Sequence, residues 1–233
     1  MPLTHRALAL LVAALYGEAG APPVTWLYRA PDDAPVMFAV VRIGRYLIVV
    51  TRGSRTFMDW VHDAIALARS PLDHPEFGLV HVGFYDGITV AWEILAPMIG
   101  PDDVVIFLGH SLGSPHAEFL AAHMLTQMKR VPFVGRWAPP KPGFQKFADI
   151  LAPAPGFAYD NYDVIGFDPV VELAWTTRDF PYVHTSPLTQ VTRAPSQNIL
   201  LDLGPQFAWH HFENYLAATP ETPVVFLGSV AGG

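Results

Sequence analysis

The sequence predicts an α/β fold with a mostly parallel central sheet that is covered by helices. Apolar segments of strand length recur along the chain, and segments with helical spacing lie between them, which is the alternation typical of parallel sheets. One apolar segment, VVIFL at 104–108, contains no polar residue, as expected for a central strand buried on both faces. The expected strands lie near Val36–Arg42, Tyr46–Thr51, Val104–Leu108, Phe133–Trp137 and Phe157–Asp163, and the expected helices cover Phe57–Ala68, Gly83–Met98, Leu112–Met128 and His210–Ala217.

The first expected element is a helix over about residues 5–16. Its apolar residues share one helical face, and glycines at 17 and 20 end the pattern. The same stretch has a basic start and an apolar run, as a secretory signal does, but no small-residue cleavage site follows it. The helix is the favoured interpretation, and a secreted and a cytoplasmic location both stay open. The apolar face consists of Leu8, Leu11, Val12 and Leu15.

The second expected helix, at about 57–68, is amphipathic. Its apolar residues recur at helical spacing, opposite Asp59, His62 and Asp63. By composition alone this helix would pack its apolar face on the sheet.

Composition and charge exclude several classes of function. The chain has 233 residues without a repeat or a Ser/Gly linker, which predicts one domain over 1–233. The formal net charge is −7 and no cluster of Lys or Arg occurs, so nucleic acid is not an expected partner. No uncharged stretch is long enough to span a membrane. The absence of cysteine excludes disulfides and thiolate metal sites, and the oligomeric state stays open.

The stretch GHSLG at 109–113 is the strongest functional motif. It stands where the strand expected at 104–108 gives way to a helix, and its serine lies between two glycines. Small flanking residues let the backbone turn sharply, which lifts the serine hydroxyl to the rim of the sheet, where open α/β sheets bind their ligands. Ser111 is therefore the candidate nucleophile, although Gly and Ser are also common in ordinary turns.

A nucleophilic serine requires two further side chains. An imidazole must remove the hydroxyl proton, and a carboxylate must orient the imidazole. Asp168 opens DPVVEL after an expected strand, and His210 opens HHFENYL near the end of the chain. Asp163 is the alternative acid, and His211 is the alternative histidine.

Six segments carry a family pattern: RGSRTFMDW at 52–60, VHVGF at 80–84, GHSLG at 109–113, APPKPGFQKFA at 138–148, DPVVEL at 168–173 and HHFENYL at 210–216. Together they resemble the class 3 (fungal-type) lipases of the α/β-hydrolase superfamily, in that family's order. The resemblance runs from the first helix to about Leu216. It implies an α/β-hydrolase fold, in which the catalytic residues follow the chain order Ser, acid, His.

The resemblance also implies roles for individual residues. Ser54 matches a serine whose backbone N–H, often with its hydroxyl, receives the oxyanion, and the N–H of Leu112 is the second donor. Asp168 carries the Pro-Val that accompanies the acid of the family. His210 stands five residues before Tyr215, as the histidine of the family does.

Other segments correspond to the family less closely. The helix at 57–68 matches a lid whose apolar face covers the site and turns towards lipid on opening. After GHSLG the chain continues with Ser114-Pro115-His116 instead of the usual Gly-Ala, which is expected to reshape the acyl pocket. The stretch VVELAWTT lacks the family's usual second proline, which affects the expected loop shape more than the role of Asp168.

The expected activity is hydrolysis of carboxylic esters, with acylglycerols as the first choice of substrate, through an acyl-enzyme at a lipid–water interface. No Walker-type loop, G-x-G-x-x-G after a strand or H-E-x-x-H occurs, so no cofactor and no metal are expected. Phospholipase A1 and short-chain or aromatic-ester esterase are the alternatives within this chemistry. A lipid-surface binding module without turnover is the alternative from another class, and the complete set of candidate residues counts against it.

Overall fold

The computed structural model describes residues 3–18, 20–53, 71–163, 166–172, 181–191 and 212–225. They form one large sheet, a separate two-stranded hairpin and helices on both faces of the sheet. In these ranges no helix has the length and apolar character needed to cross a membrane.

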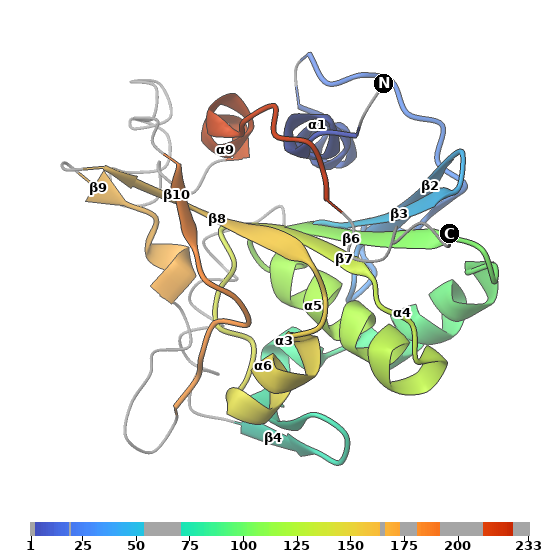
Figure 1. Ribbon diagram of the computed structural model, residues 1–233, viewed down its shortest axis with the longest axis vertical. Helices are drawn as coiled ribbons and strands as arrows, with labels where there is room; N and C mark the ends of the chain where they lie inside the picture. Colours follow the sequence, from blue (N-terminus) through green and yellow to red (C-terminus); the bar gives the residue numbers. More distant parts are fainter. Residues whose placement is uncertain are drawn as a thin grey trace, which may run out of the picture.

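The central sheet has eight strands, and the strands in its middle run parallel (Figure 1). They are β1 (Tyr28–Arg29), β2 (Phe38–Ile43), β3 (Tyr46–Thr51), β6 (Val104–His110), β7 (Phe133–Trp137), β8 (Gly156–Asp163), β9 (Gly166–Phe167) and β10 (Thr189–Val191). The order is β1-β2-β3-β6-β7-β8-β10, and β9 pairs with β8. Pairing is parallel from β3 to β10 and antiparallel for β1, β2 and β9. The predicted α/β class with a mostly parallel sheet is confirmed.

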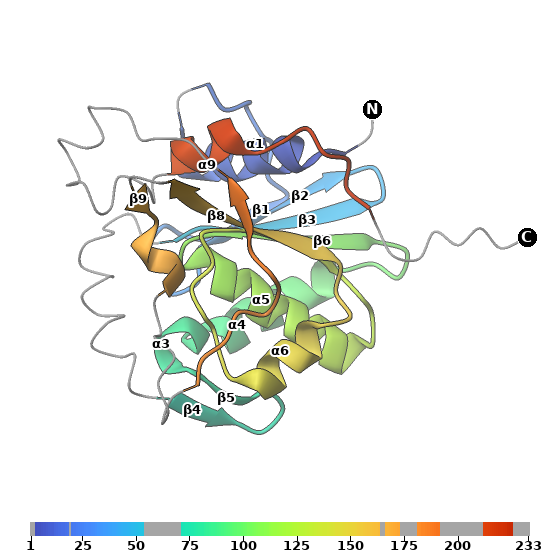
Figure 2. The same cartoon turned by 60° about the vertical axis from the view of Figure 1, so that its left-hand side comes forward.

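Helices cover both faces of the sheet. On one face, α1 (His5–Tyr16) and α9 (Phe212–Ala218) lie side by side, as both views show (Figures 1 and 2). The other face carries α3 (Val82–Tyr85), α4 (Ile88–Leu95), α5 (Gly113–His123) and α6 (Gln145–Leu151), with the hairpin of β4 (Pro71–His74) and β5 (Gly78–His81) beyond them. All residues of α5 are buried, so this helix lies in the core directly behind the strand that it follows.

Two of the expected helices differ from the observed ones. The single helix expected over Gly83–Met98 is divided into α3, α4 and a 3₁₀ turn at Ala96–Met98. The division occurs because Gly87 takes a left-handed φ of 74°, which an α-helix does not tolerate. The helix expected over Leu112–Met128 is α5 followed by a π-helical turn at Met124–Met128.

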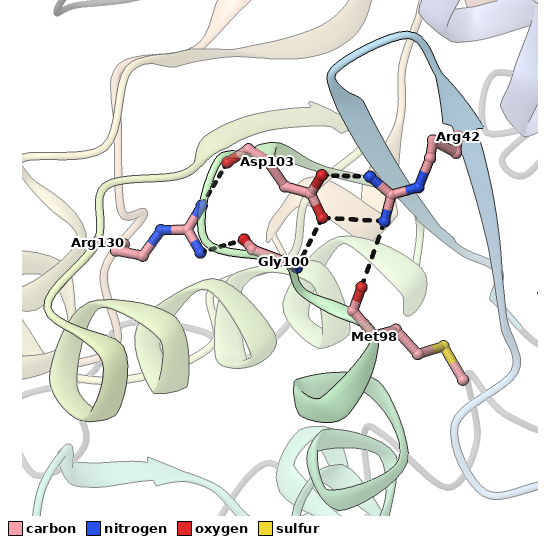
Figure 3. Close-up of polar contacts among 5 residues, drawn as sticks. All are labelled: Arg42, Met98, Gly100, Asp103 and Arg130. Atoms are coloured by element: carbon pink, nitrogen blue, oxygen red, sulfur yellow. Dashed lines mark hydrogen bonds and ion pairs between the residues drawn. The ribbon is translucent and has the colours of Figure 1, made fainter.

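A polar clasp holds the sheet at the end opposite the carboxyl ends of the parallel strands (Figure 3). Asp103, just before β6, accepts from both terminal nitrogens of Arg42 on β2 and from the backbone N–H of Gly100 (2.8 Å). Arg130, shortly before β7, donates to the carbonyl oxygens of Gly100 (2.8 Å) and Asp103. The loop that leads into β6 is thereby tied to β2 and to the segment that leads into β7.

Candidate active site

Ser111 lies on a strained turn between β6 and α5. Its φ is 58°, in the left-handed region that costs a residue with a Cβ about 1–2 kcal/mol. The backbone N–H of Ser111 donates to the carbonyl oxygen of Trp137 at the end of β7 (3.0 Å), and its own carbonyl oxygen accepts from Ser114 (2.8 Å). Leu112 then precedes the first helical residue of α5. The turn is therefore fixed from both sides.

Both glycines of GHSLG are needed because backbone segments approach closely. A Cβ on Gly109 would lie 2.2 Å from the carbonyl oxygen of Gly113, and a Cβ on Gly113 would lie 2.5 Å from that of Thr51. The hydroxyl of Thr51, at the end of β3, is also within hydrogen-bond distance of the carbonyl oxygens of Leu108 (2.8 Å) and Gly113 (2.5 Å). The first turn of α5 is thus packed against the ends of β3 and β6.

A second buried hydroxyl fastens the turn to β7. The Ser114 hydroxyl lies 2.9 Å from the carbonyl oxygens of both Gly109 and Trp137. Ser114 is fully buried, so these contacts satisfy a polar group that would otherwise be costly. The departure from the family pattern after GHSLG therefore contributes a bond across the turn.

The side chain of Asp168 is buried, and each of its two carboxylate oxygens accepts a hydrogen bond. It follows β9 and precedes a 3₁₀ turn at Pro169–Glu172. Its Oδ1 accepts from the backbone N–H of Val170 (2.9 Å), and its Oδ2 accepts from the Tyr215 hydroxyl (2.6 Å). These two bonds fix the orientation of the carboxylate.

Tyr215 connects the candidate acid to the strand that carries the candidate nucleophile. Its ring centroid lies 5.6 Å from that of His110, the residue before Ser111, while its hydroxyl contacts Asp168. Tyr215 stands on α9, five residues after His210. The position of α9 therefore brings the chain that follows His210 to the candidate acid.

Several expected residues lie outside the described part of the chain. They are Ser54, His210, His211 and the segment 57–68. Asp163 ends β8, and its side chain is not among those described. Tyr215 thus lies between Asp168 and His110, the residue before Ser111, while the roles of Ser111, Leu112, Asp168, Ser54 and His210 stay predictions.

Sequence reasoning assigned no function to Tyr16 or Thr51, and it used Tyr215 only as a spacing marker. A hydroxyl at the end of a helix or strand has no periodic signature, because its partner comes from another part of the chain. Of the residues with such hydroxyl contacts, Ser114 alone was noted in the sequence as part of the departure from the family pattern after GHSLG.

Two histidines of α5, His116 and His123, have the surroundings of core residues. Burial lowers the pKa of His116 to about 4 and that of His123 to about 4, so both are neutral at pH 7. Across the described ranges, no group of three or more His, Cys, Asp or Glu side chains is arranged to hold a metal ion.

Comparison with protein families finds one match. The family described as lipase (class 3) matches residues 48–159, which include the end of β3 and the turn at Ser111. A search of curated proteins finds no match to the chain.

Solved structures with a similar fold include proteins from the fungi Penicillium and Rhizomucor. A mutant form of MDLA from Penicillium cyclopium is 19% identical with a TM-score of 0.60, and the match covers 82% of this chain and 78% of that one. A Rhizomucor miehei lipase–propeptide complex is 17% identical with a TM-score of 0.62, covering 93% and 80%. A triacylglycerol lipase from Penicillium expansum is 17% identical with a TM-score of 0.58, covering 95% and 89%. These likenesses confirm the predicted α/β-hydrolase fold.

Proposed function

We infer that this chain, a member of the class 3 lipase family, is a serine hydrolase that cleaves carboxylic esters, with acylglycerols as its substrate class. The family match over residues 48–159 supports the reaction class. One solved structure of similar fold is described as a triacylglycerol lipase. The observation that carries the proposal is the left-handed φ of 58° at Ser111, on a strand-to-helix turn whose backbone is bonded on both sides.

In the proposed reaction, the Ser111 hydroxyl oxygen attacks the ester carbonyl carbon while His210 takes the hydroxyl proton and passes it to the leaving alcohol. The carboxylate of Asp168 orients His210. The N–H groups of Ser54 and Leu112 receive the negative charge of the tetrahedral intermediate. Water, deprotonated by His210, then attacks the acyl-enzyme, which releases the fatty acid and restores the serine.

Hydrolysis of p-nitrophenyl esters of increasing chain length, with triacylglycerol emulsions and phosphatidylcholine vesicles as further substrates, tests this proposal. We expect the wild type to hydrolyse esters and Ser111→Ala to lose about 10⁶-fold in kcat at an unchanged unfolding temperature. Asp168→Asn is expected to lose about 10⁴-fold, while Asp163→Asn serves as its matched comparison and retains activity.

Labelling by a serine-directed phosphonate separates a catalyst from a binding module. We expect the wild type to be labelled and Ser111→Ala to stay unlabelled. A wild-type protein that binds vesicles but shows neither turnover nor labelling would contradict the proposal. Loss of activity in Asp163→Asn alone would move the role of the acid to that residue.

A further inference from the structure

Tyr16 lies where separate parts of the proposed active site meet. It is the last residue of α1, which ends there because Gly17 takes a left-handed φ of 78°. The Tyr16 hydroxyl oxygen is 3.0 Å from the backbone nitrogen of Gly53 and 3.0 Å from Nδ1 of His110. Gly53 follows β3, and His110 is the last residue before Ser111. One hydroxyl therefore bridges the ends of β3 and β6.

The direction of each hydrogen bond follows from the chemistry of the groups. The N–H of Gly53 can only donate, so the Tyr16 oxygen accepts from it, and the Tyr16 proton is available to His110 when the ring proton of that histidine is on Nε2. Nδ1 of His110 is then an acceptor. Desolvation raises the pKa of Tyr16 well above its ordinary value, against smaller opposing effects of the Gly53 bond and Arg52. The hydroxyl therefore keeps its proton and makes both bonds at neutral pH.

The surroundings of this bridge leave Gly53 little room to move. A Cβ on Gly53 would lie 3.1 Å from the Cβ of Ser111 and 3.2 Å from the Tyr16 hydroxyl, so the glycine lies directly against both. The guanidinium of Arg52 lies 6.0 Å from the Tyr16 ring centroid. The backbone N–H of Arg52 donates to the carbonyl oxygen of Met37 (2.9 Å), which holds this chain segment from its other side.

Tyr16 also contacts the chain that follows the proposed base. Its ring stacks on that of Phe212, with centroids 5.9 Å apart and planes at 20°. The His110 ring lies 4.9 Å from the same phenylalanine. Phe212 is the first residue of α9 and stands two residues after His210. Tyr16 therefore contacts residues next to Ser54 and Ser111 and a residue two positions after His210.

We propose that Tyr16 is a positioning residue for ester hydrolysis: by bridging Gly53 and His110, it holds the backbone that leads to Ser54 in place against Ser111. This inference rests on the proposed function, because the effect assigned to Tyr16 is an effect on that reaction. Oxyanion donors are effective because they are fixed before the reaction, and a displacement of about 1 Å costs about 100-fold in rate. Loss of the Tyr16 hydroxyl should therefore lower kcat and leave KM nearly unchanged.

Tyr16→Phe tests the proposal, with Tyr85→Phe as the matched control. Both tyrosines are half-buried. The Tyr85 hydroxyl also has hydrogen-bond partners, which are Nε2 of His74 (2.9 Å), Nε2 of His123 (3.3 Å) and the hydroxyl of Thr89 (3.4 Å). Tyr85 is the last residue of α3, and α3 lies on the opposite face of the sheet from α1 (Figure 1). We expect similar decreases in unfolding temperature for both variants. Only Tyr16→Phe should lower kcat, by about 10- to 100-fold, with KM within about twofold of wild type.

Variants at His110 test the same bridge from its other end. His110→Asn keeps an acceptor near the position of Nδ1, whereas His110→Leu removes it. We expect His110→Leu to lower kcat as Tyr16→Phe does and His110→Asn to retain more of it. The double variant of Tyr16→Phe and His110→Leu should lose no more than the larger single loss, because both changes break one interaction.

The outcomes separate this inference from the proposed function. A wild-type kcat in Tyr16→Phe, an equal kcat loss in Tyr85→Phe, or a rise in KM at constant kcat would overturn the inference and leave ester hydrolysis standing. If Tyr16→Phe does not fold, equal kcat in His110→Asn and His110→Leu would overturn it. A wild type with neither turnover nor phosphonate labelling would remove the proposed function and this inference together.

Discussion

At the scale of single residues, the turn at Ser111 stores strain that its neighbours must offset. Ser111 has a left-handed backbone without being a glycine, which is unfavourable on its own. Its N–H bond to Trp137 and the hydroxyl bonds of Thr51 and Ser114 all end on the backbone of this turn or of the adjacent strand. Small polar side chains therefore fix the conformation, and removing one of them should be measurable.

Ser114→Ala removes a buried hydroxyl that contacts the carbonyl oxygens of Gly109 and Trp137. We expect the free energy of unfolding to fall by about 1–2 kcal/mol and the unfolding temperature to fall by about 2–8 °C, as measured by calorimetry. We also expect a lower kcat, because Trp137 holds the N–H of Ser111 as well.

Ser186→Ala is the matched control for Ser114→Ala. The Ser186 hydroxyl is also buried, but it has no hydrogen-bond partner within the described part of the chain. Its removal should leave the unfolding temperature unchanged or slightly raised. Equal destabilisation by the two variants would show that the bonds of Ser114 do not stabilise the turn.

At the scale of elements, α1 and α9 join the two ends of the chain on one face of the sheet (Figure 2). Arg6 of α1 donates to the carbonyl oxygen of Leu216 on α9 (2.7 Å), and the backbone N–H of His5 donates to the carbonyl oxygen of Thr222 (2.9 Å). Since Tyr16 ends α1 and Tyr215 lies on α9, the packing of these helices determines where two contacts of the candidate site fall.

Glu18 and Glu213 make this helix pair sensitive to pH. Burial raises the pKa of Glu18 to about 7, and the nearby carboxylate of Glu213 adds to the effect. The unfolded pKa is about 4.3, so between these values the folded protein binds more protons than the unfolded chain. Stability should therefore decrease as the pH rises from about 4.3 to 7 and stay lower above that.

Glu18→Gln should remove the decrease in stability that accompanies the rise in pH. We expect the variant to match wild type at pH 4 and to be more stable at pH 8 by about 1 kcal/mol, a value reduced for the partial exposure of the site. The corresponding rise in unfolding temperature is about 2–4 °C. Glu213→Gln should have a smaller effect of the same sign, because the burial of Glu18, which is the larger cause, remains, and the double variant should add little to Glu18→Gln. A gain that does not change with pH would contradict this explanation.

The elements also show which features of the fold are visible in the sequence. The central strands were predictable because uninterrupted apolar runs such as 104–108 are rare outside buried strands. The break between α3 and α4 was not, because a lone Gly87 inside an apolar helical pattern does not reveal its left-handed backbone. The β4–β5 hairpin is short and carries polar residues, so it has no clear alternation of apolar and polar positions.

At the scale of the whole molecule, the site depends on contacts that join distant parts of the chain. The motif GHSLG predicted Ser111 because local glycine spacing and the adjacent strand are both visible in the sequence. The environment of Asp168 was not predictable, because its partner Tyr215 is 47 positions away. Tyr16 and Gly53 are 37 positions apart. Local pattern thus identifies the turn, whereas the groups that surround it are defined only by the tertiary fold.

The clasp at the opposite end of the sheet makes the stability of the whole molecule depend on pH in the acid range. The hydrogen bond from Arg42 lowers the pKa of Asp103, and the bond from Gly100 and the charge of Arg130 add to this, although burial opposes them. The unfolded pKa is about 3.9. The clasp therefore stabilises the fold fully above that value, and this contribution is lost as the pH falls through the lower folded pKa.

Asp103→Asn should lower the free energy of unfolding at pH 7 by about 2 kcal/mol, or about 4–8 °C in unfolding temperature. The difference from wild type should shrink as the pH falls below about 3.9 and through the lower folded pKa of Asp103, because the wild-type carboxyl then becomes protonated as well. Asp102→Asn is the matched control, since it makes the same charge change at the adjacent, exposed position and should be nearly neutral at every pH. Because the clasp lies far from Ser111, kcat at 25 °C should not change in either variant. A deficit in Asp103→Asn that persists undiminished at low pH would show that lost packing, and not the ion pair with Arg42, accounts for the effect.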